Sequence, residues 1–435
     1  MKFDRSIQLN DQCHAIIPGG AHTYAKGDDQ FPEGMAPFIV RGDGSHVWDL
    51  DGNEFIEYGM GLRAVTLGHA NRRVVEAAYK QMLNGANFVR PAPIEYECAE
   101  EFLRCVAGAD MVKFAKNGSD ATSAAVRLSR GYTGRDLIAI CADHPFFSVD
   151  DWFIGTTPMV AGIPKNIREL TKTFRYNDIE SVRTLFHQHS REIACLIMEP
   201  EKDAPPRGNF LHQVKQLCHE HGTVFVLDEM ITGFRWHLGG GQRYHSIKPD
   251  LSCFGKAMGN GFSIAALAGH RDIMELGGIR HDRERVFLLS TTHGAETHNL
   301  AAGLETMRIY REEPVIDHLW RQGRRLADGV QQVSRRHGLD GFVDVSGQPC
   351  CLVYSTRDQD KKPSQPFRTL FLQETIKRGL LAPSLVVSYS HSDEDIDRTV
   401  SIIDEALLVY RKALEEGVDR YLLGRPVKPV FRKLC

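Results

Sequence analysis

Short apolar runs alternate with amphipathic segments through the middle of the chain. The runs have the length of buried strands, and the segments that separate several of them repeat their apolar residues at helical spacing. This pattern predicts strands at residues 111–115, 137–141, 193–198, 223–227, 251–254 and 285–290, with helices at 121–130 and 211–220. Because alternating strands and helices form a mostly parallel, doubly wound sheet, we expect a large α/β domain.

The two ends of the chain show a different pattern. Apolar residues at 38–40, 46–50 and 54–58 are separated by turns that contain glycine, which predicts hairpins. Further helices are expected at 71–83, 94–106, 297–310, 315–336 and 392–416, and further strands at 342–346, 350–354 and 385–389. In the helix at 71–83 the expected apolar face consists of Val74, Val75, Ala78 and Met82. We expect residues 71–310 to form the large domain, and residues 1–70 to join residues 311–435 in a smaller α+β domain.

Composition narrows the classes of function. A net charge of −3 over 435 residues gives no basic field for nucleic acid. No apolar run approaches the roughly 20 residues of a membrane-spanning helix, and the polar N-terminus lacks the apolar core of a signal peptide. The ten cysteines form no CxxC and the nineteen histidines no HExxH, so we expect reduced thiols in the cytoplasm and no metal site.

An acid and a lysine follow two of the expected strands. Asp228 ends the strand at 223–227, and Lys256 follows the strand at 251–254. Ligands of open α/β sheets bind beyond the carboxyl ends of the strands. A lysine for a carbonyl and an acid for a basic ring nitrogen together indicate pyridoxal phosphate (PLP). Alone, Lys256 reads more simply as a surface lysine, and Asp228 as a turn or helix-capping residue.

The turn before the helix at 121–130 suits a phosphate group. The strand at 111–115 ends in Lys-Asn-Gly-Ser-Asp, so Gly118 and Ser119 come at a helix start, where backbone N–H groups are free to bind an anion. The simpler reading is that Ser119 or Asp120 only caps the helix. Phe146 lies in a loop that could supply a ring to stack on a cofactor, although aromatic loop residues more often pack in a core.

Taken together, these motifs resemble the class III aminotransferases, and most closely their glutamate-1-semialdehyde aminomutase-like branch. The most specific part is LDEMITGFR followed by KPDLSCFGKAMGNGF, after IMEP. The resemblance extends from Pro18 to the HSDEDIDRT run that begins at His391. It implies a fold-type-I PLP transferase, a homodimer with its active site at the subunit interface, and a small-molecule amino donor and carbonyl acceptor.

The resemblance also assigns roles to individual residues. It implies that Lys256 forms the Schiff base with PLP and that Asp228 pairs with the pyridine nitrogen. Phe146 and Met230 match positions on the two faces of the ring, and Glu199 matches an acidic residue close to the cofactor. Residues that match phosphate-binding positions are Asn117, Gly118, Ser119 and, from the partner subunit, Thr292.

Three departures from the family pattern bear on function. The phosphate turn is Asn-Gly-Ser instead of Ser-Gly-Thr, and the stacking region is Phe-Phe-Ser instead of Tyr-His-Gly. In the N-terminal loop the aminomutase has an arginine that holds the substrate carboxylate, whereas this chain has Lys26, with Tyr24 beside it as a second expected substrate residue. A lysine is a point charge and lacks the bidentate fork of an arginine.

We therefore expect an enzyme that moves an amino group from an amino donor to an aldehyde or ketone, with a sugar or other polar metabolite as one class of acceptor. The alternative enzyme is an intramolecular aminomutase acting on glutamate-1-semialdehyde. A third reading, from a different class, is a PLP-binding scaffold without turnover. Bleaching of the cofactor absorbance by an amino donor separates the enzymes from the scaffold.

Overall fold

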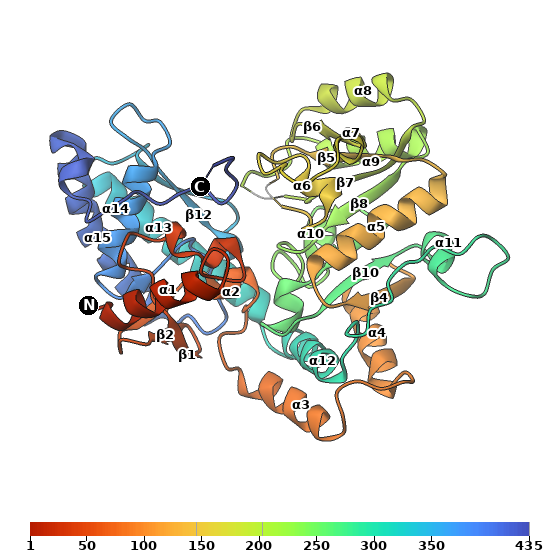
Figure 1. Cartoon of the computed structure of the whole chain (residues 1–435), viewed down its shortest axis with the longest axis horizontal. Coiled ribbons are helices and arrows are strands. Elements are labelled where there is room, and N and C mark those ends of the chain that lie inside the picture. Colours follow the sequence, from red (N-terminus) through yellow and green to blue (C-terminus); the bar gives the residue numbers. More distant parts are fainter. Residues whose placement is uncertain (145, 202, 435) are drawn as a thin grey trace. The chain divides into compact units, whose positions relative to one another are not determined.

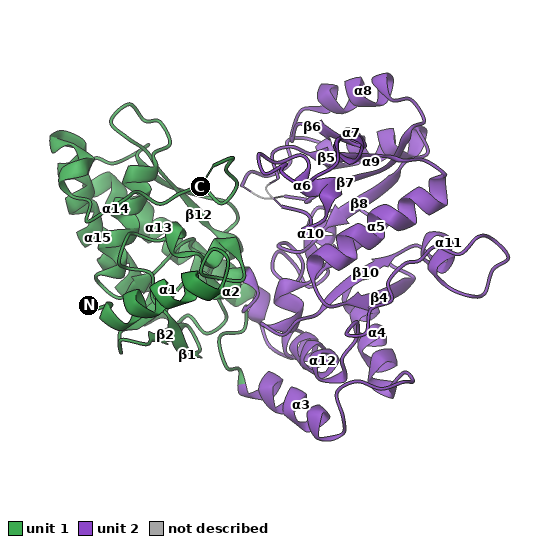
Figure 2. Ribbon diagram, in the orientation of Figure 1, with its two compact units in different colours: residues 1–62, 66–71, 317–435 green, residues 63–65, 72–316 purple. Residues whose placement is uncertain are grey.

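The computed structural model describes residues 1–144, 146–201 and 203–434, and Figure 1 gives the order of their elements. These residues fall into two compact units, which Figure 2 colours separately. Unit 1 consists of Met1–Leu62, Thr66–Asn71 and Asp317–Cys435, and unit 2 of Arg63–Val65 and Arg72–Ile316. We propose that unit 2 is the larger domain and unit 1 the smaller one.

A seven-stranded sheet forms the centre of unit 2, in the order β4–β10–β9–β8–β7–β5–β6. The strands from β9 to β6 are mutually parallel, and β10 is antiparallel to both β9 and β4, so β4 runs in the same direction as β9. The mostly parallel sheet expected from the sequence is therefore confirmed. The strand bounds are Met111–Ala115 (β4), Leu137–Cys141 (β5), Thr171–Phe174 (β6), Ile193–Met198 (β7), Val224–Asp228 (β8), Leu251–Phe254 (β9) and Ala265–Gly269 (β10).

Helices cover both faces of this sheet (Figure 1). Helix α5 (Gly118–Thr133) contacts β10, β9 and β7 through a stripe of small residues. On the other face, α8 (Ile179–Gln188) and α9 (Phe210–Glu220) pack against alternate residues of β5, β7 and β8 in one apolar core. The other helices of unit 2 include α3 (Arg72–Leu83), α4 (Pro93–Cys105), α6 (Asp151–Ile154), α7 (Lys165–Glu169), α10 (Gly240–Tyr244), α11 (Arg271–Met274) and α12 (Thr297–Glu312).

The prediction of a strand at 285–290 was wrong, because these residues form no strand. Its apolar residues are held by side-chain packing instead of strand pairing: Val286 fills the space beside Gly131 of α5, and Leu288 fills the space beside Gly277. Phe287 points away from both and is 65% exposed. The apolar run in this segment thus belongs to an extended loop that lies on a helix. Strands β6 and β10, which the sequence pattern did not indicate, complete the sheet.

Unit 1 contains two small sheets. The first has the order β1–β2–β3–β13 and joins the N-terminal strands Ile39–Asp43, His46–Asp49 and Glu54–Glu57 to Leu380–Leu381, with β13 parallel to β3. The second pairs β11 (Val343–Ser346) with β12 (Val353–Thr356). Residues 385–389 form no strand, and Leu385 makes only an isolated bridge to Leu352. The long helices are α1 (Asp4–Ile16), α13 (Val315–Arg336, which begins in unit 2), α14 (Gln365–Ile376) and α15 (Asp393–Glu416). Among the described residues, no helix is both long and apolar enough to span a membrane.

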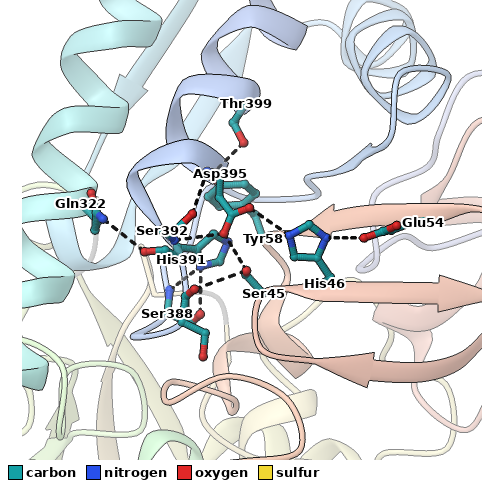
Figure 3. Close-up of polar contacts among 11 residues, drawn as sticks. Ser45, His46, Glu54, Tyr58, Gln322, Ser388, His391, Ser392, Asp395 and Thr399 are labelled. Atoms are coloured by element: carbon teal, nitrogen blue, oxygen red, sulfur yellow. Dashed lines mark hydrogen bonds and ion pairs between the residues drawn. The ribbon is translucent and has the colours of Figure 1, made fainter.

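A polar network joins the first hairpin of unit 1 to the start of α15 (Figure 3). His46 contacts Asp395 through Nε2 and Glu54 through Nδ1, each at 2.9 Å. Both partners are carboxylates, which accept hydrogen bonds, so the two contacts favour the protonated imidazole, in which both ring nitrogens donate. Ser45 also donates to Asp395 at 2.9 Å, and Asp395 completes the capping box of α15 with Ser392.

Candidate active site

Four chemical groups predicted from the sequence follow strands that run in one direction. Because β4, β7, β8 and β9 share a direction, their carboxyl ends lie at the same edge of the sheet. β7 leads into Glu199, β8 ends at Asp228, β9 leads into Lys256, and β4 leads into the turn 116–118 and helix α5. The edge where open α/β sheets bind ligands is therefore the edge that carries these residues.

Lys256 begins the 3₁₀ helix η3 (Lys256–Gly259) directly after Gly255. Its φ of 44° lies in the left-handed region, a strained conformation that non-glycine residues keep mainly where function requires it. No hydrogen bond or ion pair of its amine is found within the described ranges. Burial lowers the pKa of Lys256, while the charges of Asp228 and Glu199 oppose that shift. The amine is thus kept close to β8 in a form that can lose its proton.

The two adjacent acids after β8 have different surroundings. Asp228 is buried, and its Oδ1 accepts from the N–H of Met230 at 2.9 Å, while Oδ2 has no hydrogen bond among the residues described. Burial raises the pKa of Asp228 to about 6, against the opposing charge of Lys256. Glu229 instead accepts from the N–H groups of Gly241 and Gln242 at 2.7 and 2.6 Å, and so caps α10. Only Asp228 has an oxygen left for a ligand.

The turn before α5 leaves two backbone donors free. Asn117 is the N-cap of α5 and forms a reciprocal capping box with Asp120. The hydroxyl of Ser119 accepts from the N–H of Val149 at 3.1 Å. The N–H groups of Gly118 and Ser119 have no partner in the described part of the chain. Since these N–H groups are at the positive end of a helix of 16 residues, they can bind a phosphate.

Met230 connects the phosphate turn to the lysine. A Cβ on Gly118 would lie 2.8 Å from Met230 Sδ, and a Cβ on Gly255 would lie 2.7 Å from the same atom. Both contacts are too close for a side chain, so both positions require glycine while Met230 keeps this conformation. The buried thioether therefore lies between the turn that carries the free N–H groups and the residue before Lys256.

The remaining expected residues of unit 2 differ in their burial and in their contacts. Glu199 is buried, and its N–H donates to Nδ1 of His144 at 3.1 Å; its charge acts on Lys256. Phe146 is 41% exposed and packs edge-on against Phe153. Thr292 is exposed, and its carbonyl accepts from the side chain of Asn87 at 2.9 Å. No contact between Thr292 and the Lys256 cluster is recorded within the described residues.

The expected substrate residues belong to unit 1. Tyr24 and Lys26 form the short helix η1 (Tyr24–Lys26), and both are exposed, Tyr24 to 63%. No ion pair of Lys26 is found among the described residues. Their proposed role near a substrate therefore stays a prediction.

Sequence reasoning missed two arginines that act on Lys256. The charges of Arg63 and Arg235 both contribute to lowering its pKa. Arg235 ends the LDEMITGFR motif, so its place after β8 was a usable signal. Arg63 lies in a glycine-rich loop without a motif, and nothing in the local pattern distinguished it from a surface residue.

Comparisons with known proteins identify the family of the chain. The class-III aminotransferase family model matches residues 25–407. The chain is 32% identical to the glutamate-1-semialdehyde 2,1-aminomutase of Persephonella marina, over 92% of this chain and 98% of the relative. It is 31% identical to glutamate-1-semialdehyde 2,1-aminomutase 2 of Bacillus cereus, over 93% and 98%.

Solved structures give the same fold. The PLP internal aldimine form of the Sphingopyxis sp. MTA144 FumI protein superposes with a TM-score of 0.85 at 29% identity, over 95% of this chain and 98% of that one. A glutamate-1-semialdehyde aminomutase from Pseudomonas aeruginosa PAO1 gives 0.81 at 19% identity, over 94% and 95%, and supports the fold alone. The residues present fit PLP: a lysine for its carbonyl, a buried acid for its ring nitrogen, and a glycine cradle with two free N–H groups for its phosphate. This fold-type-I, PLP-dependent chain belongs to the class-III aminotransferase family.

Proposed function

We propose that this protein is an intermolecular aminotransferase, which moves an amino group from a donor to an aldehyde or ketone acceptor. The observation that carries the proposal is Lys26, which stands where the resemblance to the aminomutases places a carboxylate-binding arginine. A lysine at that position cannot bind the carboxylate of glutamate-1-semialdehyde with two parallel hydrogen bonds. The substrate would then be held less firmly while its amino group moves within the molecule. A sugar or other polar metabolite that carries the carbonyl is one class of acceptor compatible with this loop.

The chain's own residues would divide the chemistry as follows. PLP supplies a carbonyl that takes up the amino group and a ring that stabilises negative charge at the adjacent carbon. The Nζ of Lys256, with its pKa lowered by burial, would remove a proton from the donor's reacting carbon and return one at the acceptor's carbon. Oδ2 of Asp228 would hold a proton on the ring nitrogen. The N–H groups of Gly118 and Ser119 would bind the phosphate, with Asn117 fixing the turn.

We also propose that two copies of the chain form the working enzyme. Helix α3 exposes Val75, Tyr79, Met82 and Leu83, and the loop after it exposes Phe88 and Val89. Several large apolar side chains exposed on a helix and the loop after it are typical of a surface that another protein covers. Thr292, exposed and bonded to Asn87 in the same part of unit 2, would then reach the phosphate of the other copy. Eight of the described cysteines are free thiols, which supports the proposed cytoplasmic location; they are Cys13, Cys98, Cys105, Cys141, Cys195, Cys218, Cys253 and Cys351.

The second candidate is the intramolecular aminomutase. Its support is specific: the relatives that match over most of the chain at 31–32% identity carry that name. It requires that the substrate carboxylate be held without the arginine that the resemblance places at position 26.

Following the amino group separates the two activities. The PLP-loaded protein is incubated with glutamate-1-semialdehyde alone, and separately with a panel of amino donors and carbonyl acceptors, while the cofactor absorbance and the products are recorded. We expect bleaching by an amino donor and recovery on addition of an acceptor, with little 5-aminolevulinate from the first incubation. Efficient isomerisation without any donor would refute the aminotransferase, and no bleaching by any donor would favour the scaffold.

A further inference from the structure

The chain enters unit 2 through a turn of unusual backbone conformation. Gly61, Leu62 and Arg63 have φ values of 57°, 59° and 70°, and Met60 has 43°, so four consecutive residues are left-handed. This conformation is strained for residues that have a Cβ, and it persists only where the surroundings enforce it. Strain of this kind at consecutive positions points to a side chain that is held in place for a purpose.

The segment that follows Asp228 holds Arg63 in position. Arg235 is fully buried, and its Nη2 donates to the carbonyl of Arg63 at 2.7 Å. Its Nη1 donates to the carbonyl of Ile231 at 2.6 Å. The backbone of Arg63 is thus tied to the β8 segment that supplies Asp228 and Met230.

The side chain of Arg63 lacks the carboxylate partners that Arg73 and Arg311 have. Arg73, in the same unit, binds three glutamates, and Arg311 binds Glu101. The Nε of Arg63 is buried without a hydrogen bond, and no carboxylate pairs with its guanidinium anywhere in the described ranges. A buried donor left unpaired is destabilising unless a ligand completes it. The backbone of Arg63 is held by the segment that follows β8, and its charge also contributes to lowering the pKa of Lys256.

We propose that Arg63 binds the carboxylate of the amino donor. The guanidinium offers a planar pair of donors that matches a carboxylate, and its unpaired Nε can be one of them. The exposed amine of Lys26 offers no such fork. The inference rests on the proposed aminotransferase, and it names an amino acid as the class of donor.

Two amino donors that differ only in the carboxylate test this role. Isopropylamine is L-alanine with a methyl group in place of the carboxylate. In Arg63→Gln, the KM for L-alanine in the donor half-reaction is expected to rise about 50-fold with little change in kcat, because a charge-assisted bidentate contact is lost. The KM for isopropylamine is expected to stay within about twofold. Arg63→Lys keeps the charge but loses the planar pair of donors, so its KM for L-alanine is expected to rise about tenfold.

An unreactive probe decides the question independently of turnover. Propionate, which is L-alanine without its amino group, is titrated into the PLP-loaded protein by calorimetry. We expect binding to the wild type and at least about a tenfold loss of affinity in Arg63→Gln. Because propionate is not a substrate, its binding can be measured even if the wild type transfers no amino group. In that case the proposed function fails, but the binding role of Arg63 is still tested.

The controls separate binding from a structural effect. Arg72→Gln removes an exposed charge nearby in the sequence and should leave both donors and propionate unaffected. The proposal would be overturned if Arg63→Gln raised the KM for L-alanine and for isopropylamine equally, or if propionate did not bind the wild type. It would also be overturned if Arg63→Gln lost PLP affinity to the same extent. The last result would assign Arg63 to the cofactor.

Discussion

Two clusters of charged residues in this protein have opposite electrostatics. At the sheet edge of unit 2, burial raises the pKa of Asp228 to about 6 and lowers the pKa of Lys256. In unit 1, hydrogen bonds from His46, the Ser392 N–H and Ser45 outweigh burial and lower the pKa of Asp395, while Asp395 raises the pKa of His46. The first cluster leaves an oxygen of Asp228 for a ligand, whereas both ring nitrogens of His46 and the carboxylate of Asp395 are paired within the second (Figure 3). A site for chemistry and a contact for stability can thus be told apart by which atoms remain unpaired.

The largest expected effect comes from the lysine of the first cluster. Lys256→Ala removes the proposed proton carrier, and amino transfer should fall by at least about a thousandfold. Its effect on the stability of the cofactor-free protein should be small, since the amine has no recorded partner to leave unpaired among the described residues. Half-reaction rates and thermal unfolding measure the two. Lys80→Ala, an exposed helical lysine, is the matched control, and more than about 1% residual transfer would contradict the role.

Asp228→Asn should lower kcat by about a hundredfold or more, because an amide cannot hold the charge opposite a ring nitrogen. The stability effect has the opposite sign. An acid with a raised folded pKa favours folding below its unfolded value of 3.8 and loses that contribution as pH rises through about 6. As the pH rises from about 5 to about 8, the melting temperature of cofactor-free Asp228→Asn should therefore increase relative to that of the cofactor-free wild type. A constant difference across this range would contradict the assigned pKa.

In the second cluster, Asp395→Asn should reduce stability by about 2 kcal/mol, because it removes charge-assisted bonds to His46 and Ser45 and weakens the cap of α15. The kcat of the folded enzyme should stay close to that of the wild type. Denaturant unfolding and steady-state kinetics measure these two quantities. Glu54→Gln, at the half-exposed side of His46, should cost less. A loss of kcat without a loss of stability would mean that the network serves the active site.

The smallest expected effect is a pH dependence of the same network. The raised pKa of His46 contributes stability that is complete below the unfolded value of 6.5 and disappears as pH rises through the folded pKa. The lowered pKa of Asp395 contributes stability that is complete above pH 3.8, the unfolded pKa. That stability is lost as the pH falls through the folded pKa of Asp395. The stability difference between the wild type and His46→Gln should thus be about 1 kcal/mol larger at about pH 5.5 than at about pH 9. An equal difference at both pH values would show that folding does not raise the pKa of His46.

The same contrast explains what could be read from the sequence. The strands that lead to Glu199, Asp228 and Lys256 were predictable, because a continuous apolar run followed by a polar turn is a local signal. The role of the adjacent Glu229 was not, since it depends on the capping of α10, more than ten residues downstream. The His46–Asp395 contact joins residues 349 positions apart, which no local pattern indicates.

Two errors have a common physical cause. Periodicity shows that a face is apolar, but it does not show what covers that face. In α3 the expected face contained Val74, Val75, Ala78 and Met82, yet only Val74 and Ala78 are buried within the described chain. In 285–290 the apolar residues lie on helix α5 and on Gly277 instead of in a sheet. Strand β10, rich in alanine, carried too little β-propensity to be recognised.

The free N–H groups of Gly118 and Ser119 have a practical consequence for handling the protein. They recognise an anion through its oxygens and carry no group that distinguishes one small oxyanion from another. Inorganic phosphate and sulfate should therefore compete with the cofactor during reconstitution. Purification in such buffers would yield protein that takes up PLP slowly, and a colourless preparation would then reflect the choice of buffer salt.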